Sequence, residues 1–160
     1  MIYSVLLILG IFLGYFVAKF TKEELKSGLI YFNVLELIIL ILLPLLFLYY
    51  SFNWVLLISG IVLGIILRFE YLYFGFGIIS SFFNINLSFL SSILVFIYGL
   101  PFGGIFYYKK KFRMLFFHTI LFLIPFIFYL FKFNLLSFAA GGLLSLFVIK
   151  FGTFVKNFLR

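Results

Sequence analysis

Apolar residues run along the chain in long blocks, and short polar breaks separate each block from the next. Most blocks hold about 20 residues, which is enough for a helix to cross the ~30 Å hydrocarbon core of a bilayer. Polarity does not alternate within a block, as it would in the strands of a membrane β-barrel. Only helices and closed barrels satisfy their backbone groups in lipid, so the pattern predicts an all-α bundle of membrane helices.

The polar breaks predict seven transmembrane spans in a single integral membrane domain, residues 1–160. The spans are expected at 2–20, 28–50, 54–69, 71–83, 87–108, 114–131 and 135–155. The first block lacks the basic start and the small-residue cleavage site of a removable signal peptide, so we expect it to remain as the first helix. The fourth span would rise only about 20 Å as a helix. We therefore expect it to be thinly flanked, tilted among its neighbours or partly unwound.

The distribution of Lys and Arg predicts the orientation. With the N-terminus outside and the spans alternating, all of the 12 Lys and Arg residues except Lys132 fall on the cytoplasmic side. Merging 54–83 into one helix would put the basic loop at 109–113 opposite the one at 19–26, against the positive-inside rule. The sequence thus predicts a multi-pass protein of the cell membrane, with the N-terminus outside and the C-terminus in the cytoplasm.

The composition agrees with a membrane protein and argues against several classes of function. The chain is 67% hydrophobic and 10% charged, whereas a soluble domain is about 45–50% apolar and about 25% charged. The cytoplasmic loops account for the net charge of +8, so nucleic-acid binding is not expected. With no cysteine, no aspartate and one histidine, the chain lacks the side chains for a metal site or a cofactor site. We expect a protein that is not an enzyme.

Small residues recur four positions apart in the spans predicted to run inward. The stretch LLILGIFLG at 6–14 matches LLISGIVLG at 56–64 in seven of nine positions. Each inward-running span then ends in a cation. Small residues at this spacing allow helix backbones to approach closely, so we expect packing seams here. A duplicated unit is the second interpretation. The residues are Gly10 and Gly14, Gly60 and Gly64, Gly99 and Gly103, and Gly141 and Ser145.

The outward-running spans add to the case for duplication, since Glu36 precedes Pro44 and His118 precedes Pro125. Two halves, 1–70 and 87–160, would be joined by the short span 71–83 as a 3+1+3 parallel repeat. A seven-helix bundle without repeats is the alternative. Helix count and orientation resemble those of the SWEET sugar transporters. The proline–glutamine motif of that wider group is absent, since the chain has no glutamine, and no family is assigned.

Glu36 is the strongest candidate for an intramembrane site, because an ionised carboxylate about 12 Å inside a span is costly. It should face the bundle interior and either pair with a cation or stay protonated. Asn33 lies on the same helix face and could hydrogen-bond it. His118 lies at similar depth, and the repeat would let it share a cavity with Glu36. The alternatives are a glutamate that holds helices together and a packed histidine.

Arg68 and Glu70 interrupt the apolar sequence and are two residues apart, so they do not share a helix face. We expect a cytoplasmic hairpin there, with Tyr71 and Tyr73 at the membrane interface. A broken helix that lines a site is the alternative. A second basic group is expected to contact anionic lipid headgroups. It consists of Lys109, Lys110, Lys111 and Arg113.

These features favour a small carrier or channel for a small solute or ion. The alternative is a non-catalytic accessory or structural subunit of a larger membrane complex. Membrane lipids are expected partners under both hypotheses, and homo-oligomers are compatible with either.

Overall fold

The chain folds as a bundle of helices. The computed structural model describes residues 2–21, 25–68, 71–80, 85–109, 112–125 and 134–158, and these form seven helices and no strand. The predicted all-α fold class is confirmed for this part of the chain. The helices are α1 (Ile2–Phe20), α2 (Leu25–Tyr50), α3 (Trp54–Leu67), α4 (Tyr71–Ser80), α5 (Ile85–Tyr108), α6 (Phe112–Leu123) and α8 (Leu136–Phe158).

Three of these helices are long and apolar enough to cross a membrane. Their apolar segments are Gly28–Tyr50 in α2, Phe89–Tyr108 in α5 and Leu136–Lys156 in α8. Two shorter apolar segments, Leu9–Phe20 and Trp54–Leu67, lie in α1 and α3. Length and composition therefore mark the chain as a membrane protein. The predicted spans 71–83 and 114–131 both extend into residues outside the described part.

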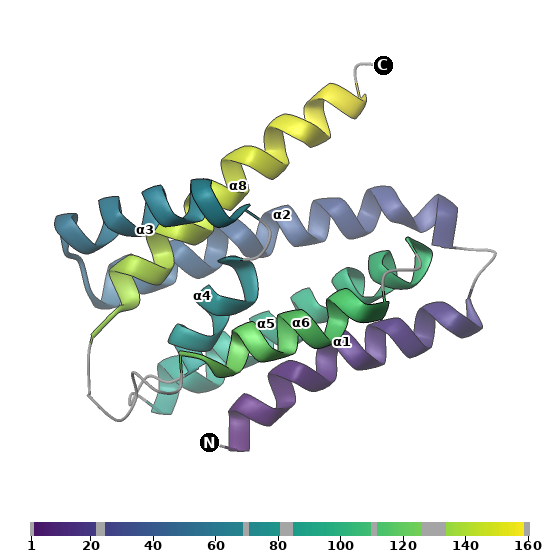
Figure 1. Ribbon diagram of the computed structural model, residues 1–160, viewed down its shortest axis with the longest axis horizontal. Helices are drawn as coiled ribbons and strands as arrows, with labels where there is room; N and C mark the ends of the chain where they lie inside the picture. The colour runs from purple at the N-terminus through teal and green to yellow at the C-terminus, as the bar shows by residue number, and fades with distance from the viewer. Residues whose placement is uncertain are drawn as a thin grey trace.

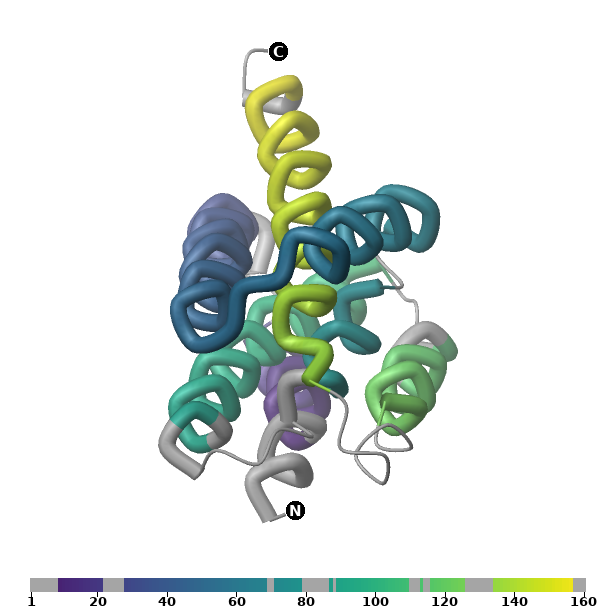
Figure 2. Tube along the Cα trace, turned by 90° about the vertical axis from the view of Figure 1, so that its left-hand side faces the viewer, coloured from purple at the N-terminus to yellow at the C-terminus, as the bar shows by residue number. Residues whose placement is uncertain are grey.

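The direction of the chain alternates along the bundle. In Figure 1, α1, α3, α5 and α8 run in one general direction, and α2 and α6 run in the other. Figure 2 shows α8 near the middle, with α2 and α3 on either side of it. Both of these helices pack directly on α8, and α2 also packs on α5.

Helix α2 differs from a helix of a soluble protein, because apolar residues cover both its buried and its exposed face. Leu40, Leu43 and Phe47 are fully buried, whereas Ile38 and Leu42 are exposed on the outer face. In water such a face would mark an association site. In a bilayer it is the expected surface towards lipid. The charged side chain of Glu36 is instead buried inside the bundle.

The first close seam joins α1 to α5. A Cβ atom at Gly14 would clash with the carbonyl oxygen of Leu100, and one at Gly103 would clash with that of Ile11. Gly10 and Gly99 lie against each other's helices in the same manner. Glycine therefore lets the two backbones touch, as expected for helices that associate without water to drive them together.

The second seam joins α3 to α8 by the same means. A Cβ atom at Gly60 would clash with the carbonyl oxygen of Phe138, and one at Gly141 would clash with that of Leu57. At the far end, Gly64 lies against Gly142 and the hydroxyl of Ser145. The small residues singled out in the sequence thus lie in two seams, and each seam pairs two inward-running segments of the prediction.

Hydrogen bonds fix the starts of α3 and α8 beside each other. The side chain of Asn53 caps α3 by accepting from the backbone N–H groups of Val55 and Leu56, at 3.0 and 3.3 Å. The hydroxyl of Ser137 accepts from the backbone N–H of Asn53 at 3.0 Å and donates to the carbonyl of Ser51 at 2.8 Å. These bonds satisfy backbone groups that a helix start otherwise leaves open.

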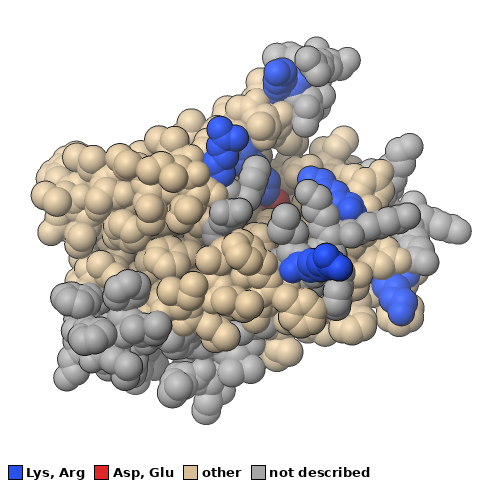
Figure 3. Space-filling view, viewed as in Figure 1, with Lys and Arg blue, Asp and Glu red and all other residues tan. Residues whose placement is uncertain are grey.

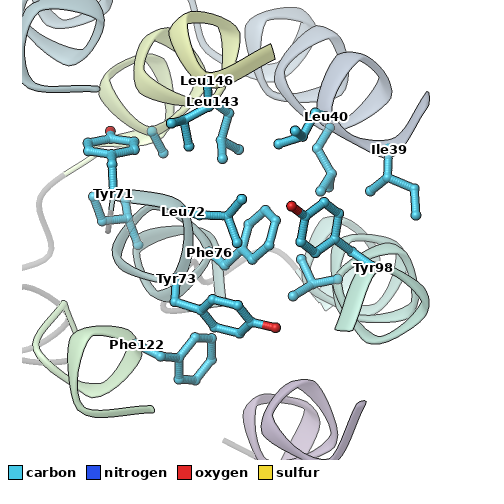
Figure 4. Packing of buried hydrophobic residues seen from close by; sticks show 14 of the residues in the cluster. Ile39, Leu40, Tyr71, Leu72, Tyr73, Phe76, Tyr98, Phe122, Leu143 and Leu146 are labelled. Carbon is cyan, nitrogen blue, oxygen red and sulfur yellow. The ribbon is translucent and has the colours of Figure 1, made fainter. Parts of the chain in front are cut away.

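Helix α4 lies in the middle of the bundle, inclined to its longer neighbours (Figure 1). Tyr71, Leu72, Tyr73 and Phe76 are all buried, and Figure 4 places them between α8, α5 and α6. The prediction placed Tyr71 and Tyr73 at the membrane interface, and the structure shows that both side chains face the interior of the bundle. Arg68 and Glu70 closely precede the two tyrosines in the sequence, which suggested an interface, but α4 lies inside the bundle and buries them.

Candidate functional site

The site is centred on an ion pair between Glu36 of α2 and Lys150 of α8. The Glu36 side chain has no exposed surface, and that of Lys150 is 13% exposed. Glu36 lies on the inner stripe of α2, one turn before Leu40 and two turns before Leu43. The same periodicity that buries these leucines thus brings the carboxylate into the bundle.

The ammonium group of Lys150 also contacts an aromatic ring, that of Tyr98. The Nζ atom of Lys150 lies 5.6 Å from the centroid of the Tyr98 ring, within the range of a cation–π interaction. Tyr98 comes from α5 and is fully buried. The carboxylate, the ammonium and the ring therefore come from α2, α8 and α5, the three helices whose described residues form apolar segments long enough to cross a membrane.

The site holds polar atoms with unused hydrogen-bonding capacity. Within the described residues, neither Glu36 oxygen accepts a hydrogen bond apart from its contact with Lys150. The hydroxyls of Tyr98 and Tyr73 are buried and have no hydrogen-bond partner in the same part of the chain. Buried polar atoms are nearly always paired in folded proteins, so these atoms are sites for a water molecule, an ion or a ligand.

His118 lies in an aromatic cluster on the α6 side of the site. Its ring centroid is 5.6 Å from that of Tyr73, 5.5 Å from that of Phe102 and 5.2 Å from that of Phe106. The cluster reaches Tyr98, since the ring of Phe102 lies 5.6 Å from it. Figure 4 shows Tyr73 and Tyr98 approaching from α4 and α5. His118 therefore has aromatic neighbours, while Glu36 has Lys150.

Asn33 lies one turn before Glu36 and is half-buried. It does not hydrogen-bond the carboxylate, whose oxygens accept from no such donor. The sequence did not identify Lys150 as the ionic partner of Glu36, and it marks this residue only as the cation near the end of the last inward-running span. The signal was its position after Gly141 and Ser145, but periodicity alone does not say which span packs against α2.

The other charged residues of the prediction that the structure describes are exposed at the ends of helices. Arg68 is exposed, ends α3 with φ of 51°, and donates its backbone N–H to the carbonyl of Gly64. Lys109 and Arg113 are exposed at the adjoining ends of α5 and α6. Figure 3 shows Lys and Arg side chains gathered over one half of the visible face. Glu70, Lys110 and Lys111 lie outside the described residues.

The described residues hold no group of three His, Cys, Asp or Glu side chains that could bind a metal ion. Models of known protein families give no match to the chain, and neither the curated proteins nor the solved structures contain a match.

Proposed function

We propose that this protein is a small carrier that moves a small solute or ion across the cell membrane, with Glu36 and Lys150 at its centre. The observation that carries the proposal is the buried ion pair where the three long apolar helices meet. Charges within a membrane bundle are costly and tend to mark the paths of substrates, ions or protons.

Stability alone is a weak explanation for such a pair. The cost of removing two charges from water often exceeds their mutual attraction, so a buried ion pair is weak evidence for a purely stabilising role. This bundle already has two seams in which glycine allows direct backbone contact. The pair is therefore better explained by a role that needs charge in the interior.

The proposed topology is seven spans with the N-terminus outside and the C-terminus in the cytoplasm. The alternating directions of the helices in Figure 1 support it. So does the placement of Lys19, Arg68, Lys109 and Lys156 at or near the ends of α1, α3, α5 and α8, which run the same way. These cations would then face the cytoplasm, as the positive-inside rule requires.

The proposed 3+1+3 repeat, with halves 1–70 and 87–160, draws support from one constant spacing. Pro44 and Pro125, Asn53 and Asn134, and Gly60 and Gly141 are each 81 positions apart. Asn134 accepts from the backbone N–H of Leu136 at 3.4 Å, in the manner in which Asn53 caps α3. Gly60 and Gly141 lie in the same seam, each against the other's helix. Helix α4 would be the linker between the halves.

A transport assay with a panel of probes tests the proposal. Proteoliposomes of wild type, Glu36→Gln and Lys156→Gln would be exposed to gradients of alkali chlorides, alkylammonium chlorides and small neutral solutes, and swelling would be recorded by light scattering. Lys156 is an exposed cation on the helix of Lys150, so it is a matched control. We expect at least one probe to enter faster than in empty liposomes, and this flux to be lost only in Glu36→Gln. Equal flux in wild type and Glu36→Gln would count against the carrier.

One observation favours the second function, an accessory subunit of a larger complex. Glu36 is completely buried and already has a cationic partner, which also describes a charge that only holds helices together. Purification in mild detergent distinguishes the two functions. A carrier is expected as a monodisperse species of this chain alone, whereas constant co-purification of another membrane protein in fixed ratio would favour the accessory role.

A further inference from the structure

We propose that the Glu36 carboxylate and the Tyr98 ring form a binding site for a primary ammonium cation, which Lys150 occupies as a tethered substitute. This inference rests on the proposed function, because it names the class of solute that the carrier would take. The ligand would be a small amine in its charged form, such as an alkylammonium ion.

The first argument is the chemistry of what is already bound. The Nζ group of Lys150 is a primary ammonium on an alkyl stem, and it contacts a carboxylate and an aromatic face. A carboxylate supplies charge-assisted hydrogen bonds, and the ring supplies a cation–π contact. A site that holds the lysine ammonium in this way offers the same contacts to a free one.

The second argument is the unused acceptor capacity around the ammonium. An ionised carboxylate can accept about four hydrogen bonds, and a primary ammonium brings three donors. Apart from Lys150, the Glu36 oxygens have no hydrogen-bond partner among the described residues, and the buried Tyr98 hydroxyl is also unpaired there. These atoms suit a ligand rich in N–H donors. A quaternary ammonium has none and would leave the carboxylate unsatisfied.

The third argument concerns which partner can leave. Glu36 has no exposed surface, whereas the side chain of Lys150 is partly exposed. Lys150 lies in the second half of α8, towards the end that carries Lys156. Its flexible stem of four carbons would let the ammonium swing out towards water or headgroups. An incoming ammonium would then replace it one for one, so the buried carboxylate is never left without a cation.

Binding to the purified protein in detergent tests this site. Titrations with ethylammonium, tetramethylammonium and sodium chlorides would be followed by calorimetry in wild type, Lys150→Gln, Glu36→Gln and Lys156→Gln. Lys150→Gln removes the tethered ammonium that competes for the site. It should tighten ethylammonium binding by about tenfold or more, because Glu36 is then free to bind ligand in every molecule. Glu36→Gln should abolish binding, Lys156→Gln should match wild type, and tetramethylammonium should not bind.

A second variant protects the test against misfolding. In the Lys150→Gln background, Tyr98→Leu leaves the Glu36 carboxylate unchanged and removes the aromatic ring together with its hydroxyl. It should weaken ethylammonium binding by roughly two- to thirty-fold. Each variant is checked first for a monodisperse elution profile, and Glu36→Asp replaces Glu36→Gln if the latter aggregates, with binding expected to be weakened but measurable.

The outcomes separate this inference from the proposed function. Unchanged ethylammonium affinity in Lys150→Gln, or tighter binding of sodium than of ethylammonium, would overturn the amine site. Glu36-dependent flux of another probe without amine binding would also overturn it, while the carrier would stand. Amine binding that follows the expected pattern, without any flux, would support the site and refute the carrier.

Discussion

The hydroxyl of Tyr71 donates a hydrogen bond to the backbone carbonyl of Phe138, 2.8 Å away, and ties the short helix α4 to α8. The same carbonyl is the group that a side chain at Gly60 would strike. The Phe138 carbonyl, near the start of α8, therefore contacts both α4 and α3.

Replacing Tyr71 with phenylalanine is expected to lower the free energy of unfolding by about 0.5–1.5 kcal/mol, because the part-buried hydrogen bond to the Phe138 carbonyl is lost. Unfolding in mixed micelles with increasing SDS, followed by circular dichroism, measures the change. Tyr49→Phe is the control, since Tyr49 is 86% exposed. A loss of the same size in both variants would contradict this role for the Tyr71 hydroxyl.

Alanine at Gly14 or Gly60 is expected to destabilise the bundle by about 1–3 kcal/mol through overpacking, since the new methyl group meets a backbone carbonyl that has no room to move. Gly152 supplies the matched control, because a Cβ atom there has nothing within 4 Å. We expect Gly152→Ala to keep or slightly raise the stability, as alanine is the better helix former. Thermal unfolding of the three variants in one detergent gives the comparison.

Removing one member of the buried pair should cost more than removing both. Lys150→Met leaves the carboxylate of Glu36 buried without a cation, and a loss of about 3–5 kcal/mol is expected. The double variant Glu36→Gln, Lys150→Met carries no buried charge and should recover most of that loss. A double-mutant cycle from SDS unfolding measures the coupling. Additive effects of the two substitutions would mean that the pair does not exist in the membrane.

The proposed orientation can be tested with single cysteines, because the chain has none of its own. Cysteine at the exposed positions Lys109 and Lys156 should react with a membrane-impermeant maleimide only in inverted vesicles. Cysteine at Phe52, in the turn between α2 and α3, should react only in right-side-out vesicles or intact cells. Labelling of Phe52→Cys and Lys156→Cys from the same side would contradict the alternating spans.

Much of the fold follows from the sequence, because long apolar blocks with polar breaks leave few alternatives to membrane helices. The small residues at Gly14 and Gly60 identified helix faces that lie in seams. The partners of those faces did not follow, since spacing along one helix carries no information about which other helix it meets.

The same limit applies to the site. Glu36 could be selected because a carboxylate deep in an apolar span is costly, and this reasoning holds for any bundle. Its partner depends on how α8 crosses α2, which periodicity does not determine. For Tyr71 and Tyr73 the neighbouring charge pointed to an interface, but burial was decided by the inward turn of α4.

The most direct measurement is the initial rate of ethylammonium entry into proteoliposomes of wild type, Glu36→Gln and Lys156→Gln at equal protein density. If Glu36 and Lys150 form the site of a carrier for amines, Glu36→Gln falls to the rate of empty liposomes while Lys156→Gln keeps the wild-type rate. Entry into wild-type and Glu36→Gln proteoliposomes at the same rate would contradict it.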